Sequence, residues 1–148
     1  MRRYSTALVT VLVFALAAVL AATGGRGPAA PQDPARGWQI PPDAEQVQNP
    51  LQVTPVILAS GKALFRNKCQ RCHGPEGLGN GPDADPDHRE DMNLTNPARA
   101  AQNPDGVVFN KVWNGRERPK MPTFKSEMTR DQVWTVVSYV QTLRKPKM

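Results

Sequence analysis

The chain has 148 residues, a net charge of +6 at pH 7 and two cysteines. This length suits one folded domain with a targeting segment and a linker, and the low cysteine count excludes a disulfide framework. A basic protein can bind nucleic acid, an anionic membrane or an acidic protein face. The sequence holds no nucleic-acid motif, and its basic residues are not interleaved with aromatic ones. We therefore expect an acidic protein partner and no nucleic acid.

Residues 1–23 have the pattern of an export segment. Arg2 and Arg3 precede an uncharged apolar run over residues 7–22. That run is slightly long for the core of a signal peptide and slightly short for a membrane span. We therefore expect either a cleaved signal peptide or an uncleaved membrane anchor. In both cases the rest of the chain is exported to the periplasm or the outer face of a bacterial inner membrane, because the arginines stay inside.

Residues 24–52 are rich in proline and glycine, which predicts an extended, semi-rigid linker. Trp38 and Ile40 are its first sizeable apolar side chains and are suited to lie against the domain that follows. The folded domain is predicted over residues 53–148.

The domain is predicted to open with a helix over residues 55–67. Thr54 can cap this helix, and Pro55 suits its first position, where no amide hydrogen is needed. Gly61 and Phe65 are four positions apart and share a face. Because a glycine costs helix stability, we expect another backbone to approach closely there. The alternative is that Gly61 separates two short helices.

The run Cys69-Gln70-Arg71-Cys72-His73 has the C-x-x-C-H spacing of a c-type haem attachment site. Two thiols on one helical turn can each add to a vinyl group of the porphyrin, and the imidazole of His73 can then bind the iron. A redox disulfide and half of a zinc site are the alternatives. The first requires a thioredoxin-like βαβ context, and the second requires two more ligands, while the only other histidine is His88.

The segment after this run predicts a loop and then further helices. Residues 74–86 are rich in glycine and proline, and the acidic residues within 83–91 are expected to form a solvated face. Further along, Asn103 is placed to cap a helix with Pro104 at its first position, and Gly115 is placed to end it.

A haem held by His73 leaves a second axial position on the iron, for which Met121 is the candidate ligand. Pro122 holds the chain extended after Met121, so the thioether can reach across the ring from His73. A thioether favours Fe(II) and raises the reduction potential. Met92 and His88 are the alternative ligands, and simple core packing is the alternative role of Met121.

The last helix is the clearest of the predicted elements. Thr129 and Gln132 form a capping-box pattern at its start. One apolar face follows, and we expect it to pack on the face that carries Gly61 and Phe65. This face consists of Val133, Val136, Val137, Val140 and Leu143.

The attachment run, Met121-Pro122 and residues 139–143 together resemble a class I cytochrome c, a mono-haem protein. The resemblance covers roughly residues 55–143. It implies an all-α cytochrome c fold, a small helical domain wrapped around one covalently bound haem c. The first and last helices of this fold cross at a glycine and aromatic residues, which are matched here by Gly61, Phe65 and Tyr139.

The resemblance also implies a partner for the proximal histidine. In this family a Gly-Pro follows the attachment run, and the proline carbonyl accepts a hydrogen bond from Nδ1 of the histidine. Pro82 of Gly81-Pro82 matches that proline, which assigns its carbonyl to His73. The leucine that follows the proline in the family is displaced here to Leu94.

The function implied is that of an electron carrier, not an enzyme. Cys69 and Cys72 would hold the haem, His73 and Met121 would ligate its iron, and single electrons would pass between respiratory redox partners. The residues Asn49-Pro50-Leu51 and the proline-rich lead are also similar to cytochrome c subunits of bacterial membrane respiratory complexes. A fixed subunit of a membrane-bound oxidoreductase is therefore one alternative, and a haem enzyme or sensor with a labile sixth ligand is another.

Basic residues surround Met121 in the sequence. Beside an exposed haem edge they would steer an acidic partner, and the alternative is an ordinary solvated loop. These residues are Arg116, Arg118, Lys120 and Lys125.

Overall fold

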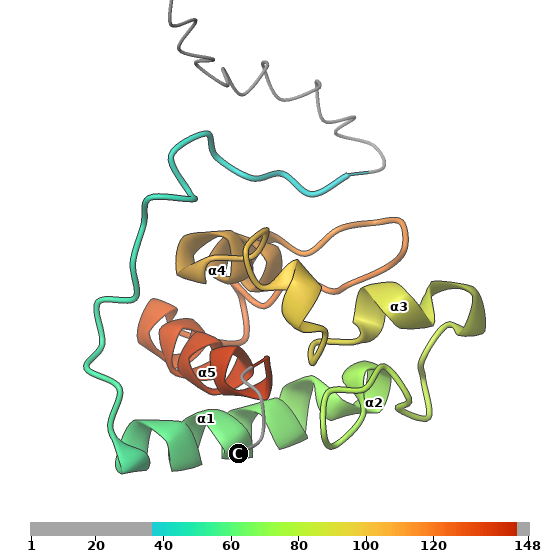
Figure 1. The fold of residues 1–148 in the computed structure, drawn as a ribbon, viewed down its shortest axis with the longest axis horizontal. Coiled ribbons are helices and arrows are strands. Elements are labelled where there is room, and N and C mark those ends of the chain that lie inside the picture. The colour runs from blue at the N-terminus through green and yellow to red at the C-terminus, as the bar shows by residue number, and fades with distance from the viewer. Residues whose placement is uncertain (1–36, 145–148) are drawn as a thin grey trace, which may run out of the picture.

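The computed structural model describes residues 37–144, and within this range the chain forms helices and loops without a strand (Figure 1). This confirms the all-α prediction. None of the helices in this range is long and apolar enough to cross a membrane, and the predicted export segment lies outside the described residues. The elements in order are α1 (Pro55–Lys68), α2 (Gln70–His73), a 3-10 turn (Pro86–His88), α3 (Arg89–Met92), a second 3-10 turn (Pro97–Arg99), α4 (Asp105–Asn114) and α5 (Arg130–Leu143).

Helix α1 begins as its sequence predicts. The Thr54 hydroxyl accepts a hydrogen bond of 3.2 Å from the Ile57 amide, and Pro55 occupies the first turn. The helix runs through Gly61 without a break, so the alternative of two short helices is wrong.

Helices α1 and α5 cross at Gly61, and this crossing organises the domain. A methyl group at Gly61 would meet the Thr135 carbonyl and would lie 2.8 Å from Cβ of Tyr139. Beside it, the rings of Phe65 and Tyr139 are 5.4 Å apart between centroids. The close backbone approach expected at Gly61 is therefore confirmed.

The core lies where α4 and α5 pack together with α1. Helix α5 carries the predicted capping box, in which Gln132 N donates to the Thr129 hydroxyl and Thr129 N donates to the Gln132 side chain. The Phe109 and Trp134 rings stack at 4.2 Å between α4 and α5. The buried core consists of Phe65, Val108, Phe109, Val112, Phe124, Met128, Val133, Trp134, Val136, Val137 and Val140.

Helix α4 begins one residue later than predicted. Pro104 is its N-cap and Asp105 its first residue, so Asn103 does not cap it. The Asn103 side chain instead accepts a hydrogen bond from Lys111, and its carbonyl accepts from Gln141 and Arg144. The helix ends at Gly115, whose φ of 65° suits a glycine, as predicted.

The segment over residues 37–53 packs against the domain and is not a free spacer. In Figure 1 it runs from above α4, past the side on which α5 begins, to the start of α1. Asn49 Nδ2 donates to the Trp134 carbonyl (3.0 Å) and to Ser138 Oγ (2.8 Å). Ala44 is 1% exposed and packs against Gly106 of α4. A Cβ atom added at Gly106 would meet the carbonyl oxygen of Ala44. The described part of the predicted linker thus contacts the helices through Ala44 and Asn49.

The acidic residues before and within α3 form specific pairs. Asp83 binds Arg71 (2.6 Å), and Asp85 binds His88 (2.9 Å). Asp91 binds Arg99 at 3.2 Å and reaches Arg116 of the loop after α4 at 3.4 Å. Most of these acidic residues are exposed, as predicted, and in addition Asp91 ties α3 to two other parts of the chain.

Candidate haem site

The two cysteines and the histidine of the attachment run lie on one tight turn. Cys69 ends α1, with its amide bonded to the Phe65 carbonyl at 2.8 Å, and it also begins α2. The amides of Cys72 and His73 then donate back to the Cys69 carbonyl. Because Cys69 terminates the helix that crosses α5, the core holds this turn in place.

Burial affects the acidity of both thiols. Burial, followed by the charge of Cys72, raises the pKa of Cys69 to about 12, and burial also raises the pKa of Cys72. A zinc site or a reactive redox pair needs thiolates, which these surroundings disfavour. In residues 37–144, no three side chains among His, Cys, Asp and Glu gather as a metal site.

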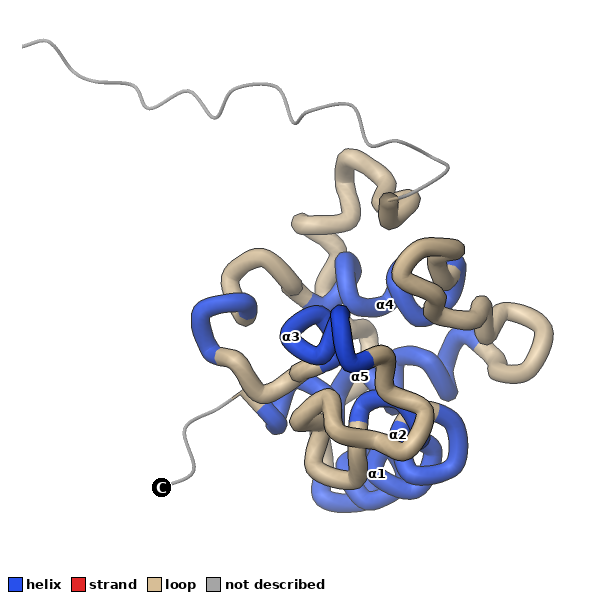
Figure 2. Tube along the Cα trace, turned by 90° about the vertical axis from the view of Figure 1, so that its right-hand side faces the viewer, coloured by secondary structure: helices blue, strands red, loops and turns tan. Residues whose placement is uncertain are grey.

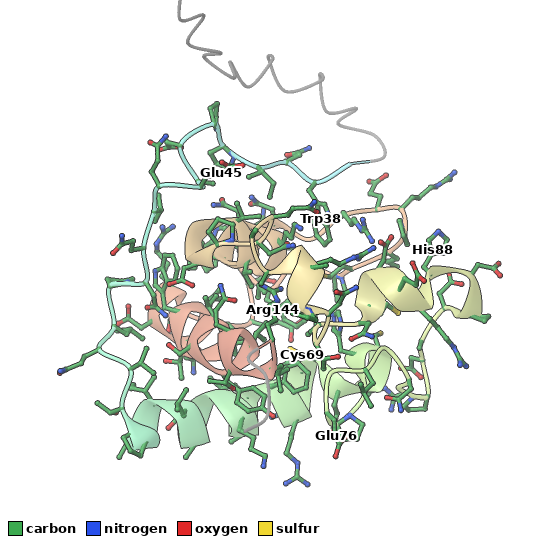
Figure 3. All side chains as sticks on the ribbon, viewed as in Figure 1. Trp38, Glu45, Cys69, Glu76, His88 and Arg144 are labelled. Carbon is green, nitrogen blue, oxygen red and sulfur yellow. The ribbon has the colours of Figure 1, made fainter. Side chains whose placement is uncertain are left out.

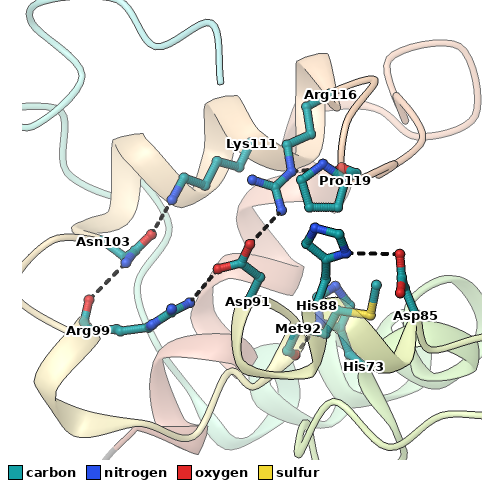
Figure 4. Close-up of polar contacts among 10 residues, drawn as sticks. All are labelled: His73, Asp85, His88, Asp91, Met92, Arg99, Asn103, Lys111, Arg116 and Pro119. Atoms are coloured by element: carbon teal, nitrogen blue, oxygen red, sulfur yellow. Dashed lines mark hydrogen bonds and ion pairs between the residues drawn. The ribbon is translucent and has the colours of Figure 1, made fainter. Parts of the chain in front are cut away.

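A backbone carbonyl fixes the ring of His73. Its Nδ1 lies 2.7 Å from the Met92 carbonyl, which accepts the Nδ1 hydrogen and leaves Nε2 for a metal (Figure 4). Burial lowers the pKa of His73, although the bond to Met92 opposes this shift. The imidazole is thus held in the neutral form and tautomer that bind iron.

The prediction that the Pro82 carbonyl accepts the hydrogen bond from His73 is wrong, because the Met92 carbonyl does so. Residues 83–91 extend the loop after Gly81-Pro82, so the chain returns to the histidine only at Met92. Leu94 follows Met92 by two residues and lines the pocket, which agrees with its predicted displacement. The loop that leads to Pro82 is held elsewhere, since the Gly81 amide donates to the Cys72 carbonyl at 3.3 Å.

Met121 borders the same pocket and lies on the loop after α4, which hydrogen bonds hold in place. Its backbone forms two hydrogen bonds of 2.9 Å with Arg116, and Thr123 Oγ1 donates to the Trp113 carbonyl at 2.7 Å. The loop leaves α4 at Gly115, whose Cβ position would lie within 2.7 Å of Pro122. The side of the molecule that carries α2, α3 and this loop faces the viewer in Figure 2.

The alternative iron ligands are less well placed. His88 pairs with Asp85 at 2.9 Å, and its side chain is 41% exposed. Met92 borders the pocket, but its carbonyl is bonded to His73, so it belongs to the histidine side of the site. Of the three candidates, Met121 is the one whose loop is separate from the histidine side.

The pocket between these residues fits a flat apolar group. Cys69, His73 and Met121 all border it, and aliphatic and aromatic side chains of α1, α4 and α5 form its wall. The adjoining part of the pocket is bordered by Cys72 as well. An apolar wall beside two thiols and one oriented imidazole suits a covalently bound porphyrin. The wall consists of Phe65, Leu94, Val108, Val112, Val136 and Val140.

The part of the pocket away from Cys72 is basic, which the sequence analysis missed. Its polar side chains come from the second 3-10 turn, α4, the loop after it and the end of α5, far apart in the sequence, so no local motif marks them. They are Arg99, Asn103, Lys111, Arg116 and Arg144.

Comparisons with known proteins agree with this arrangement. A family model described as cytochrome c matches residues 58–144, a range that contains Cys69, Cys72, His73 and Met121. No curated protein matches the chain.

Similar solved structures include the following two. A chain of the reducing HAO-like protein complex Kustc0457/Kustc0458 of Kuenenia stuttgartiensis is 27% identical with a TM-score of 0.53, covering 67% of this chain. The match covers 50% of that chain, so this protein spans about half its length. The c-type cytochrome KustC0563 is 26% identical with a TM-score of 0.45, covering 57% of this chain and 98% of its own.

Proposed function

The chain belongs to the cytochrome c family, and we propose that it transfers single electrons through one covalently bound haem, ligated by His73 and Met121. One observation carries this proposal. A single apolar pocket is bordered by the turn that carries Cys69 and Cys72, by the oriented imidazole of His73 and by Met121. The haem, when bound, supplies the Fe(III)/Fe(II) couple.

The residues of the chain keep this site rigid. The bond from His73 to the Met92 carbonyl orients the imidazole before any metal is bound. The hydrogen bonds between Arg116 and Met121 do the same for the thioether side. Two fixed ligands leave little to rearrange when the charge on the iron changes, and they keep oxygen off the metal. This supports an electron carrier over a haem enzyme or sensor.

The test is to express the full chain in bacteria competent in haem ligation and to record its mass and absorption spectrum. We expect one tetrapyrrole adduct per chain and, in the oxidised form, a thioether–iron charge-transfer band. A colourless protein of unmodified mass would overturn the proposal. An adduct without the band and with ready carbon monoxide binding would favour the enzyme or sensor.

We further propose that the protein acts outside the cytoplasm and docks on an acidic redox partner. Arg118, Lys120 and Lys125 are exposed around Met121, whereas Arg116 turns inward to Asp91. We expect Lys120→Gln to slow electron transfer to an acidic oxidase at low salt, with the difference vanishing at high salt. Lys62→Gln, on exposed α1 surface, is the charge-matched control. A rate independent of salt would remove the docking claim.

A fixed subunit of a larger oxidoreductase is the second candidate. The similar chain at a TM-score of 0.53 comes from a protein complex, and this chain spans only half of it. Native purification with and without detergent, followed by N-terminal sequencing, separates the two. A cleaved protein that purifies alone without detergent is a diffusing carrier, whereas an uncleaved one that co-purifies with other chains is a subunit.

A further inference from the structure

Lys111 and Arg144 converge on one residue at the basic end of the pocket. Lys111 Nζ donates to Asn103 Oδ1 at 2.5 Å, and Arg144 donates to the Asn103 carbonyl at 2.9 Å. Asn103 thus holds a cation from α4 and a cation from the end of α5 beside each other. Both cations border the pocket.

Neither cation forms an ion pair with an acid of the described chain, although the charge of Asp105 acts on Arg144 and that of Asp91 acts on Lys111. Asp91 binds Arg99 and Arg116, as Figure 4 shows. Within residues 37–144, no carboxylate lies within 4.0 Å of Lys111 or Arg144, and the bonds of both cations go to neutral oxygens.

Burying two cations that lack an ion-pair partner costs free energy, unless an anion binds beside them. Arg144 is only 8% exposed. Burial, and next the charges of Arg144, Arg116 and Arg99, lower the pKa of Lys111 to about 8. The carboxylates of Asp91 and Asp105 offset part of this charge, but four basic side chains border the pocket, so an excess of positive charge remains.

The position of these cations identifies the anion. Cys72 borders only one part of the pocket, while Lys111, Asn103 and Arg144 border only the other part. The residues that border both parts include Cys69, His73 and Met121. In Figure 3, Arg144 lies between Trp38 above and Cys69 below. On a porphyrin, the two carboxylate chains lie on the half of the ring away from the vinyl groups. A haem joined at the cysteines would therefore direct its carboxylates toward the basic part.

Building on the proposed function, we infer that Lys111 and Arg144 form a carboxylate-binding site for the two propionate groups of the haem, with Asn103 positioning both cations. The segment before α1 completes this site. The Trp38 ring covers it, with Lys111 Nζ at 5.1 Å and the Arg116 guanidinium at 4.3 Å from its centroid. This cover limits the access of water, so each cation acts more strongly on the iron.

The test compares Lys111→Gln and Arg144→Gln, singly and together, in the haem-loaded protein. The matched controls are Lys62→Gln and Arg66→Gln, which remove the same charges from exposed positions of α1. Midpoint potential and haem content per chain are measured. A lost cation near the iron favours the ferric form, so we expect each site variant to shift the equilibrium about tenfold toward Fe(III). For a one-electron couple this is about 59 mV.

Conservative variants separate a charge effect from a structural one. Lys111→Gln can still bind Asn103, and Lys111→Arg should restore the potential. Potentials of the site variants equal to those of the exposed controls would overturn the inference. So would a fall in potential that Lys111→Arg does not rescue. A wild-type protein without a haem adduct would instead overturn the proposed function itself, so the two failures are distinguishable.

Discussion

Arg116 and Met121 are joined by two backbone hydrogen bonds, each 2.9 Å long, in which each residue both donates and accepts. The Arg116 side chain is itself fixed, since Nε donates to the Pro119 carbonyl at 2.8 Å and the guanidinium lies over Trp38. The loop that presents Met121 is therefore closed on itself and tied to the basic end of the pocket. These contacts hold the backbone of Met121 in place.

The first prediction concerns Met121→Leu. Leucine keeps the apolar volume but has no sulfur, so the sixth position opens. We expect loss of the thioether–iron charge-transfer band, carbon monoxide binding by the ferrous form, and a lower potential. The fall should be on the order of 0.1 V, within the roughly 0.8 V that axial ligands span.

The control for this experiment is Met92→Leu. Met92 is 8% exposed and also borders the site, but its contact with His73 uses the backbone carbonyl. The band should survive in this variant. Loss of the band from Met92→Leu and not from Met121→Leu would show that Met92, and not Met121, is the iron ligand.

The second prediction is that Asn49→Ala weakens the fold although Asn49 precedes α1. Its side chain donates to the Trp134 carbonyl and Ser138 Oγ, and accepts from the Leu51 amide at 3.0 Å. Losing these bonds should lower the free energy of unfolding by about 1–2 kcal/mol. Denaturant unfolding of the haem-loaded protein measures this. The neighbour Gln48 is exposed, and a similar loss in Gln48→Ala would refute the specific role of Asn49.

The third prediction is that Gly61→Ala destabilises the protein despite a better helix propensity. Alanine alone would gain about 1 kcal/mol in α1. The added methyl meets the Thr135 carbonyl, which α5 holds in place, and such overpacking costs about 1–3 kcal/mol or more. We expect a net loss in thermal unfolding. Ser60→Ala, at the adjacent exposed position, should be neutral or slightly stabilising, and a stabilised Gly61→Ala would show that the helices can separate.

The fourth prediction concerns acid stability through Asp91. Burial raises the pKa of Asp91, but hydrogen bonds and charges from Arg99 and Arg116 outweigh it, so the net pKa lies below its ordinary value. Below the unfolded-state pKa of about 3.9, the unfolded chain binds the proton more readily than the folded one. The stability that Asp91 contributes is therefore present above this pH and is lost as the pH falls through its folded-state pKa.

Asp91→Asn tests this reasoning. At pH 7 we expect it to lower the free energy of unfolding by up to about 1 kcal/mol, a modest value because Asp91 is partly exposed and screened by solvent. The loss should shrink as the pH is lowered toward 3. Asp87→Asn is the control, since Asp87 pairs with no basic side chain within residues 37–144. An equal pH dependence in both variants would contradict the role of Asp91.

Local patterns in the sequence were sufficient wherever both partners lie within about one helical turn. The capping box of Thr129 and Gln132 is one such case, and the turn that carries Cys69, Cys72 and His73 is another. Gly61 differs from these cases, since a glycine on a predicted helix face implies close packing but does not identify its distant partner. Family resemblance supplied that partner by naming Tyr139.

Composition was a poorer guide to the segment before α1. Its prolines and glycines predict a spacer, because they oppose regular secondary structure. Irregular backbone can still pack, however, and Asn49 and Ala44 anchor this segment through contacts with α4 and α5. Composition therefore described its conformation and not its packing.

The sequence by itself determined the proposed chemistry of this protein, because covalent haem attachment needs particular residue types at a short spacing. Only the tertiary structure decided that the Met92 carbonyl, not that of Pro82, meets His73, and that Lys111 and Arg144 share Asn103. These relationships join residues far apart along the chain. They depend on where the loop over residues 83–91 returns and on how α4 and α5 pack, which no local pattern encodes.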